Sequence, residues 1–205
     1  TLTAPYNDID AVRRLVAAHR KDLACIILEP IAGNMGVVPP APEFLSALRR
    51  LTAENDILLV FDEVISGFRV NYGGAQALYG ITPDLTILGK IIGGGLPVGA
   101  YGGRRDLMSQ IAPSGPIYQA GTLSGNPVAM AAGLATLELI QAPGFYESLA
   151  AKTRTLRDGL EQAARDAGIA FTTTGVCAMF GLYFCEGPIN GYADAMRSDS
   201  AHFNQ

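Results

Sequence analysis

Three short apolar runs constrain the fold of this chain more than any other feature. The runs are residues 24–28, 57–61 and 85–88, and none of them alternates between apolar and polar side chains. A strand that is apolar on both sides is typical of a parallel sheet that is covered on both faces. Segments with helical spacing separate the runs. The sequence therefore predicts an α/β fold, with a mainly parallel sheet and helices on both faces.

Helical segments are predicted on either side of these runs. Ile9, Val12 and Val16 recur at helical spacing after Asp8, a residue type that caps helix starts. The other predicted helices are residues 42–55, residues 126–141 with Pro127 in the first turn, and residues 145–167 before Gly168. Further strands are predicted at residues 97–101, 170–174 and 179–184. The Pro-Gly pair at residues 143–144 marks a boundary between two parts of the chain.

The composition excludes several classes of protein. Hydrophobic residues make up 49% of the 205 residues and charged residues 17%, so the chain has enough apolar side chains for a core. The net charge is −4 and no long basic run occurs, which argues against a nucleic-acid partner. No apolar stretch reaches the ~18 residues of a membrane span. Cys25, Cys177 and Cys185 lack metal-ligand spacing, so we expect small buried hydrophobes in a reducing compartment and no metal site.

Charged side chains follow each of the three predicted inner strands. Glu29, Asp62 and Lys90 stand just past the ends of the runs. In open parallel sheets, ligands bind at that edge. Most lysines are solvated surface charges, but Lys90 is bracketed by apolar residues and precedes three glycines. We expect burial to lower its pKa and free the amine as a nucleophile, as Schiff-base chemistry requires.

The Gly89-Lys90 pair does not belong to a nucleotide-binding motif. A phosphate loop requires glycine five residues before the Gly-Lys pair and serine or threonine after it, where this chain has Asp84 and Ile91. The dinucleotide-binding pattern fails as well, because Val98 stands where its last glycine belongs. Both interpretations are rejected.

The other polar candidates each allow a second interpretation. Asp62 is either the N-cap of a following helix or a carboxylate that keeps a ring nitrogen protonated. Glu63 either holds local hydrogen bonds or is exposed. Gly121 and Thr122 suit a phosphate, although they also fit an ordinary helix start. The segment from Glu29 to residue 36 is equally compatible with a plain loop. His19 and His202 are isolated and are expected at the surface.

Several longer strings of the sequence together resemble the class III aminotransferases, which depend on pyridoxal 5′-phosphate (PLP). The strings are residues 29–35 (EPIAGNM), 61–69 (FDEVISGFR), 73–76 (GGAQ), 82–105 (TPDLTILGKIIGGGLPVGAYGGRR), 118–127 (YQAGTLSGNP), 192–195 (YADA) and 197–199 (RSD), so the resemblance covers nearly the whole chain. The GGRR at residues 102–105 and the string at residues 119–127 resemble the aminomutase branch, which converts glutamate-1-semialdehyde to 5-aminolevulinate in tetrapyrrole synthesis.

The resemblance implies a role for each matching residue. Lys90 would be the Schiff-base lysine and the proton shuttle, and Asp62 would pair with the pyridinium nitrogen. Val64 would pack against the ring. Gly121 and Thr122 would reach the cofactor phosphate of a neighbouring subunit, so the active unit would be a homodimer. The resemblance also implies a cytoplasmic enzyme, or a plastid enzyme in a plant or alga. Glu29 and Asn34 would lie near the cofactor.

The resemblance also predicts a fold and its limits. It implies fold type I, with residues 1–143 as the C-terminal half of the PLP-binding domain and residues 144–205 as the start of a small α+β domain. Substrate-carboxylate residues would lie outside this chain, so we expect the chain alone to have little activity. Two alternatives remain. One is an ω-transaminase with separate amino donor and acceptor, and the other is a catalytically incomplete fragment.

Overall fold

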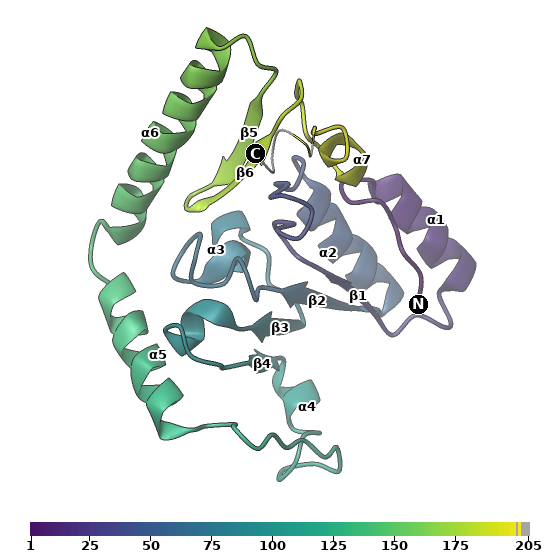
Figure 1. Ribbon diagram of the computed structural model, residues 1–205. Helices are drawn as coiled ribbons and strands as arrows, with labels where there is room; N and C mark the ends of the chain where they lie inside the picture. The colour runs from purple at the N-terminus through teal and green to yellow at the C-terminus, as the bar shows by residue number, and fades with distance from the viewer. Residues whose placement is uncertain (200, 202–205) are drawn as a thin grey trace.

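The main sheet has four strands. The fold is described for residues 1–199 and 201 of a computed structural model (Figure 1). The strands β1 (Cys25–Leu28), β2 (Leu58–Asp62), β3 (Leu85–Leu88) and β4 (Ala100–Gly103) lie in the order β1-β2-β3-β4. The first three are parallel and β4 runs antiparallel to β3. This confirms the mainly parallel α/β sheet.

The fourth strand begins three residues later than predicted. Ala100 pairs with Leu88, whereas Pro97 lies before the ladder. Proline has no amide hydrogen to donate to a neighbouring strand, so the pairing starts after it.

One face of the sheet is covered by helices. α1 (Ile9–His19) and α2 (Phe44–Asn55) pack their buried side chains against Leu59 and Phe61 of β2, both of which are fully buried. Asp8 caps α1 as predicted, because its carboxylate accepts a hydrogen bond from the Ala11 amide at 2.8 Å. A further short helix, α3 (Gly74–Tyr79), was not predicted. Tyr79 adds to the same core, so these helices hold β2 in the middle of the sheet.

The opposite face is covered only in part. The strand register places Cys25, Ile27 and Tyr101 on this face, and all three side chains are exposed. The prediction of a buried Cys25 is therefore wrong. Cys25 lies on the edge strand β1 and on the side away from α1 and α2, so nothing in the described part of the chain packs over it. Cys177 and Cys185 are half-buried.

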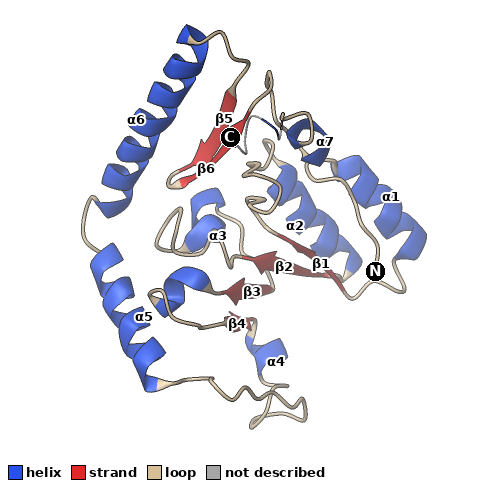
Figure 2. Cartoon of the chain, viewed as in Figure 1, coloured by secondary structure: helices blue, strands red, loops and turns tan. Residues whose placement is uncertain are grey.

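The part of the chain after residue 143 packs against the part before it. After the short α4 (Arg105–Met108) come α5 (Pro127–Ile140), α6 (Phe145–Asp166), the hairpin β5 (Thr172–Val176) and β6 (Met179–Tyr183), and α7 (Tyr192–Ala195) (Figure 2). Met179 shares a core with Ile31 and Val70, and Tyr183 shares another with Val38. The domain boundary at residue 143 stays a prediction, but the two parts it separates share these cores.

Helix α5 lies against the segment that follows β3. This segment is η1 (Lys90–Gly93), a short 3₁₀ helix. A Cβ atom on Gly133 would lie 2.1 Å from the Ile92 carbonyl oxygen, so only glycine permits this approach. Among the described residues, no single helix is long and apolar enough to span a membrane. α5 and α6 meet the criterion of length and composition only as a pair, and the chain bends by 82° between them.

Candidate functional site

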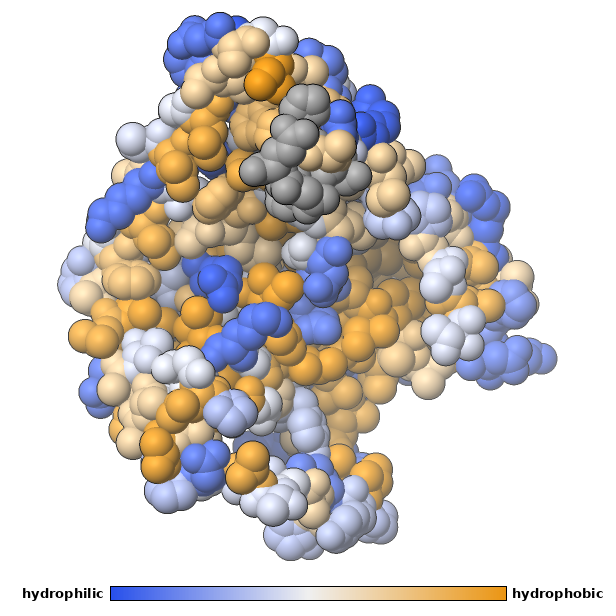
Figure 3. Space-filling view, in the orientation of Figure 1, coloured by the Kyte–Doolittle hydropathy of each residue, from blue (hydrophilic) through white to orange (hydrophobic). Residues whose placement is uncertain are grey.

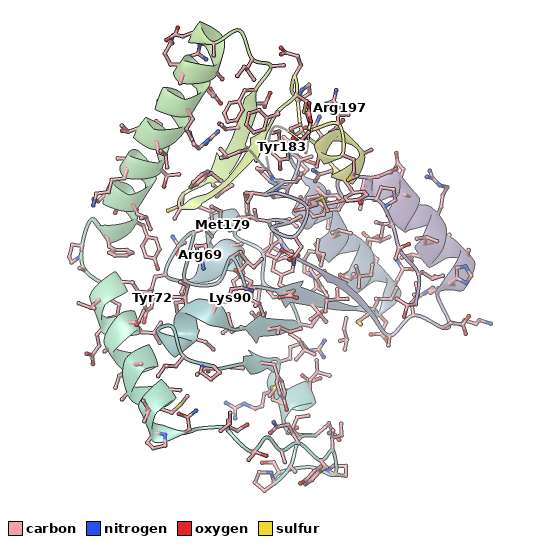
Figure 4. All side chains as sticks on the ribbon, in the orientation of Figure 1. Arg69, Tyr72, Lys90, Met179, Tyr183 and Arg197 are labelled. Carbon is pink, nitrogen blue, oxygen red and sulfur yellow. The ribbon has the colours of Figure 1, made fainter. Side chains whose placement is uncertain are left out.

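The ends of β2 and β3 bring two predicted site residues to one edge of the sheet. Asp62 is the last residue of β2 and lies opposite Ile87 in the β2–β3 ladder. Lys90 follows β3 by two residues and starts η1 (Figure 4). Because β2 and β3 are parallel, the segments that follow them leave the sheet at the same edge. The predicted clustering of Asp62 and Lys90 at this edge is thus seen in the fold.

Asp62 does not start a helix. One carboxylate oxygen, Oδ1, accepts a hydrogen bond from the Val64 amide at 3.0 Å, and a series of turns follows. The N-cap interpretation is therefore wrong, since the short carboxylate closes a tight turn instead. Within residues 1–199 and 201, the other oxygen of this half-buried carboxylate accepts no hydrogen bond. It is available to a donor from a ligand.

Val64 lies beside the backbone that leads to Lys90. Its Cγ1 methyl group would be 3.2 Å from a Cβ atom at Gly89, so Val64 packs directly over that glycine. A larger residue at position 89 would displace Val64. The pair therefore forms an apolar contact next to Lys90 in the chain, and apolar side chains of this kind suit a flat ring ligand.

Lys90 is exposed, which contradicts the predicted burial. The residues that follow it, Gly93, Gly94 and Gly95, have no side chains to cover the amine. In the described part of the chain its amine makes no hydrogen bond or ion pair. Its backbone φ of 48° lies in the left-handed region, where a non-glycine residue costs about 1 kcal/mol. Such strained residues cluster at functional sites.

Glu63 is fully buried and is hydrogen-bonded on both oxygens. Oε2 accepts from the Ser66 hydroxyl at 2.9 Å and the Ala75 amide at 2.7 Å, and Oε1 accepts from the Gln76 amide at 3.0 Å. Of the two interpretations left open for Glu63, local hydrogen bonding is confirmed. The carboxylate fixes the start of α3 and closes the loop between residues 63 and 75.

Arg69 and Tyr72 lie in this closed loop, and sequence reasoning assigned them no role. The Arg69 Nε atom donates to the Ile65 carbonyl at 3.0 Å. The Tyr146 hydroxyl donates to the Phe68 carbonyl at 2.8 Å, and burial raises the pKa of Tyr146 to about 12. Tyr72 accepts a hydrogen bond from Gln141. The signal in the sequence was the arginine that ends the FDEVISGFR string, beside a buried strand end.

The segment after β1 folds back on its own glutamate. Glu29 accepts from the Gly33 amide at 2.7 Å and from the Asn34 side chain at 2.6 Å. The hydroxyl of Tyr183 in β6 donates to the Gly36 carbonyl and fixes the far end of this loop. Glu29 and Asn34 are therefore paired with each other, and their predicted place near a cofactor remains a prediction.

Gly121 and Thr122 lie in the turn before α5, whereas Lys90 lies in η1. Both are exposed in the turn before α5, which begins as an ordinary capped helix because Asn126 accepts from the Ala129 amide at 2.9 Å. Gly121 and Ser124 help to line a cavity of about 590 Å³, together with Pro97, Val98 and Met130. Lys90 does not line this cavity. The predicted contact of Gly121 and Thr122 with a cofactor phosphate stays a prediction.

The remaining candidates behave as expected where the structure describes them. His19 is exposed in the last turn of α1, and His202 lies outside the described residues. Among residues 1–199 and 201, no group of three or more His, Cys, Asp or Glu side chains could hold a metal ion.

Comparison with known proteins gives one family. A model described as aminotransferase class-III matches residues 3–193. An ω-transaminase from Sphaerobacter thermophilus is 41% identical with a TM-score of 0.87, over 93% of this chain and 44% of that chain. A β-phenylalanine aminotransferase from Variovorax paradoxus is 36% identical with a TM-score of 0.91, over 99% and 47%.

A third structure belongs to a different reaction type. It is a glutamate-1-semialdehyde aminomutase from Pseudomonas aeruginosa in complex with PMP, 26% identical with a TM-score of 0.83, over 96% of this chain and 45% of that chain. The chain thus spans slightly less than half the length of each of these three structures.

Proposed function

The chain belongs to the class III aminotransferase family, and on this premise we propose that the full-length protein is an enzyme that uses PLP to move an amino group. The observation that carries the proposal is that Asp62 and Lys90 both lie at the carboxyl ends of two adjacent parallel strands, β2 and β3. Within the residues that the structure describes, one oxygen of the Asp62 carboxylate accepts no hydrogen bond and the Lys90 amine has no partner, and both residues lie at the same edge of the sheet. These are the two groups that a pyridine aldehyde requires from a protein.

The residues present fit the cofactor. Asp62 offers a carboxylate oxygen to a protonated ring nitrogen, Val64 and Gly89 form an apolar contact, and Lys90 has a free amine. When bound, PLP supplies an aldehyde carbon that bonds to amines and a ring that accepts electrons. Asp62 holds the ring nitrogen in its charged form, which strengthens that electron withdrawal. Thr122 would hold the phosphate of the partner subunit's cofactor.

Lys90 then acts as the acid and base. Its Nζ atom would remove a proton from the substrate carbon that bears the amino group and would deliver a proton to the cofactor carbon on the other side of that nitrogen. An exposed, unpaired amine on a glycine-rich segment suits this role, because it meets no ion pair that would hold it away from the substrate.

The finer proposal is that the substrate is glutamate-1-semialdehyde and the product 5-aminolevulinate. The reaction is an isomerisation, in which an amino group leaves one carbon of the substrate and an amino group is placed on the next. The GGRR at residues 102–105 and the QAGTLSGNP at residues 119–127 support this branch of the family. The aminomutase relative bound to PMP also supports it, since PMP is the amino form of the cofactor.

The test supplies the purified full-length protein, loaded with pyridoxamine phosphate, with glutamate-1-semialdehyde and no other amino acceptor. We expect continuous formation of 5-aminolevulinate over many turnovers. A reaction that stops after one equivalent per site would contradict the aminomutase proposal. The segment 1–205, assayed beside it, is expected to show little or no turnover because it spans under half of the related structures.

The second candidate is an ω-transaminase. The identities of 41% and 36% to an ω-transaminase and a β-phenylalanine aminotransferase favour it. This enzyme would share Asp62 and Lys90, but it needs a separate amino donor and acceptor. Multiple turnovers with β-phenylalanine only when pyruvate is added, and none with glutamate-1-semialdehyde alone, would select this candidate.

The proposed active unit is a homodimer. The outer side of α5 exposes large apolar side chains, with Val128 68%, Leu134 60% and Leu139 72% exposed, and Tyr118 in the preceding loop is 84% exposed. Figure 3 shows apolar side chains along the side of the molecule where α5 lies in Figure 1. A patch of this kind is typical of a subunit interface. A monomeric full-length protein in sedimentation experiments would contradict it.

A further inference from the structure

Arg69 holds an unusual position among the arginines of the described residues. It is half-buried, yet its one hydrogen bond runs from Nε to the Ile65 carbonyl at 3.0 Å. In residues 1–199 and 201 its terminal Nη1 and Nη2 atoms meet no carboxylate and no carbonyl. A guanidinium has five N–H donors, so four donors of Arg69 remain open to a ligand.

In the other two half-buried arginines, a terminal nitrogen of the guanidinium donates to the protein. Arg49 donates to the Asp84 carboxylate at 2.9 Å, and Arg157 donates to the hydroxyl and the carbonyl of Thr173 at 2.9 and 3.3 Å. Removing a charge from water is unfavourable unless a partner replaces the water. Arg49 has such a partner within the protein, whereas the terminal nitrogens of Arg69 do not.

The loop around Arg69 is fixed on several sides. Glu63 joins its two ends, and the Tyr146 hydroxyl donates to the Phe68 carbonyl at 2.8 Å. The Phe68 and Tyr72 rings pack edge to face with their centroids 5.4 Å apart. Nε is held by the backbone, so the orientation of the guanidinium is set before any ligand arrives. A pre-positioned guanidinium loses less conformational entropy on binding an anion.

The same loop carries the cofactor-facing groups. Asp62 and Val64 stand at its start, and a Cβ atom on Gly67 would lie 2.7 Å from the Leu88 side chain, so the loop packs against the end of β3. Figure 4 shows Arg69 and Lys90 in the same part of the molecule, beside α3 and η1. Arg69, with its terminal nitrogens, therefore lies on the loop that follows Asp62, in the same part of the molecule as Lys90.

We propose that Arg69 binds the carboxylate of the amino-acid substrate through Nη1 and Nη2. The planar fork of a guanidinium matches the two oxygens of a carboxylate, and the pair forms two parallel charge-assisted hydrogen bonds. The inference rests on the proposed function, because it requires an amine substrate that carries a carboxylate. It adds a substrate-binding residue inside this chain, where the family resemblance placed those residues outside it.

The experiment compares amines that differ only in the carboxylate. The PLP-loaded full-length protein is titrated with 5-aminolevulinate and 1-amino-2-butanone, and with β-phenylalanine and 1-phenylethylamine, while the cofactor absorbance is followed. In Arg69→Gln we expect the half-saturating concentration of the carboxylate-bearing amines to rise about 10- to 100-fold. The values for the two carboxylate-free amines are expected to stay unchanged. Arg69→Lys keeps the charge without the fork and is expected to lie between.

The control is Arg50→Gln, which removes an exposed arginine on α2. It should leave all four titrations unchanged. Equal changes for both members of a pair, or no change at all, would overturn the assignment of Arg69. So would failure of both Arg69 variants to take up PLP, because that result assigns the residue to folding.

The two proposals fail in different ways. A wild-type protein that responds only to the carboxylate-free amines overturns the Arg69 assignment and leaves amino transfer standing. A wild-type protein that responds to none of the four amines overturns both.

Discussion

The loops that follow β2 and β3 leave the sheet at the same edge, but they are held in opposite ways. The loop after β2 is closed by the buried carboxylate of Glu63, which accepts hydrogen bonds from Ser66, Ala75 and Gln76. The segment after β3 contains Lys90 and three glycines. Gly95 there has a φ of 94°, and a Cβ atom on it would meet nothing within 4 Å.

This difference separates two tasks of the proposed site. Asp62 and Arg69 need fixed positions, since a pre-oriented charge stabilises a ligand without reorganising. Lys90 has to deliver protons to more than one atom, and its exposed side chain leaves it room to do so, although the backbone of the segment packs against α5, where a Cβ atom on Gly94 would lie 2.5 Å from the Ala132 carbonyl oxygen. The closed loop thus supports binding and the exposed Lys90 side chain supports proton transfer.

The largest expected effect comes from removing the amine in the segment after β3. Lys90→Ala in the full-length protein should lower turnover by at least about 1,000-fold, because no other group of the segment can bond to the cofactor or move the proton. Borohydride reduction followed by peptide mapping should find the cofactor on the Lys90 peptide of the wild type and nowhere in the variant. Lys21→Ala, which removes an exposed lysine, is the matched control. A reducible adduct on the same peptide of Lys90→Ala would show that another residue carries the cofactor.

The sequence predicted the supports of this site better than its details. The three apolar runs became β1, β2 and β3, because continuous apolar runs are typical of parallel strands, but only one face of this sheet is covered by helices and Cys25 and Ile27 are exposed on the other. The positions of Asp62 and Lys90 followed from those runs. Short α3 was missed, since its first residue is Gly74, a weak helix former.

What stayed out of reach were properties set by distant partners. Two of the partners of Glu63, the Ala75 and Gln76 amides, lie 12 and 13 residues further along the chain, so no local pattern revealed that both of its carboxylate oxygens accept hydrogen bonds. The burial of Lys90 was predicted from its apolar neighbours in sequence, but exposure depends on which side chains pack over it. The glycines after Lys90 provide none.

Two glycine substitutions test the contrast between the loops directly. A Cβ atom at Gly74 would lie 2.5 Å from Glu63 Oε2, and the φ of Gly74 is 71°, so Gly74→Ala adds a collision to backbone strain. We expect it to lower the free energy of unfolding of the full-length protein by about 2 to 4 kcal/mol. Gly95→Ala adds strain alone and should cost about 1 kcal/mol. Urea unfolding measures both, and equal losses would show that the Glu63 loop is no more tightly held than the segment after β3.

An effect smaller than that of Gly74→Ala is expected at the opposite end of β3, where Asp84 accepts hydrogen bonds from β2, α2 and Arg104. Burial by itself raises the pKa of this carboxyl, but hydrogen bonds from the Leu59 amide and from Arg104 and Arg49 outweigh it and hold the pKa below its usual 3.8. The folded protein therefore binds the proton less readily than the unfolded chain, so this contribution to stability is complete above about pH 4 and is lost as the pH falls through the lowered pKa.

Asp84→Asn should lower the free energy of unfolding by about 1 to 2 kcal/mol near pH 7, and the difference from wild type should shrink below about pH 4. Asp106→Asn, at an exposed carboxylate that also binds Arg104, should cost less than Asp84→Asn, because solvent screens this ion pair. If the difference in free energy of unfolding between Asp84→Asn and the wild type is the same near pH 7 and pH 3, the strand ends are held by packing and not by this charge. Of the buried carboxylates Glu63 and Asp84, only Glu63 would then hold its part of the sheet through hydrogen bonds.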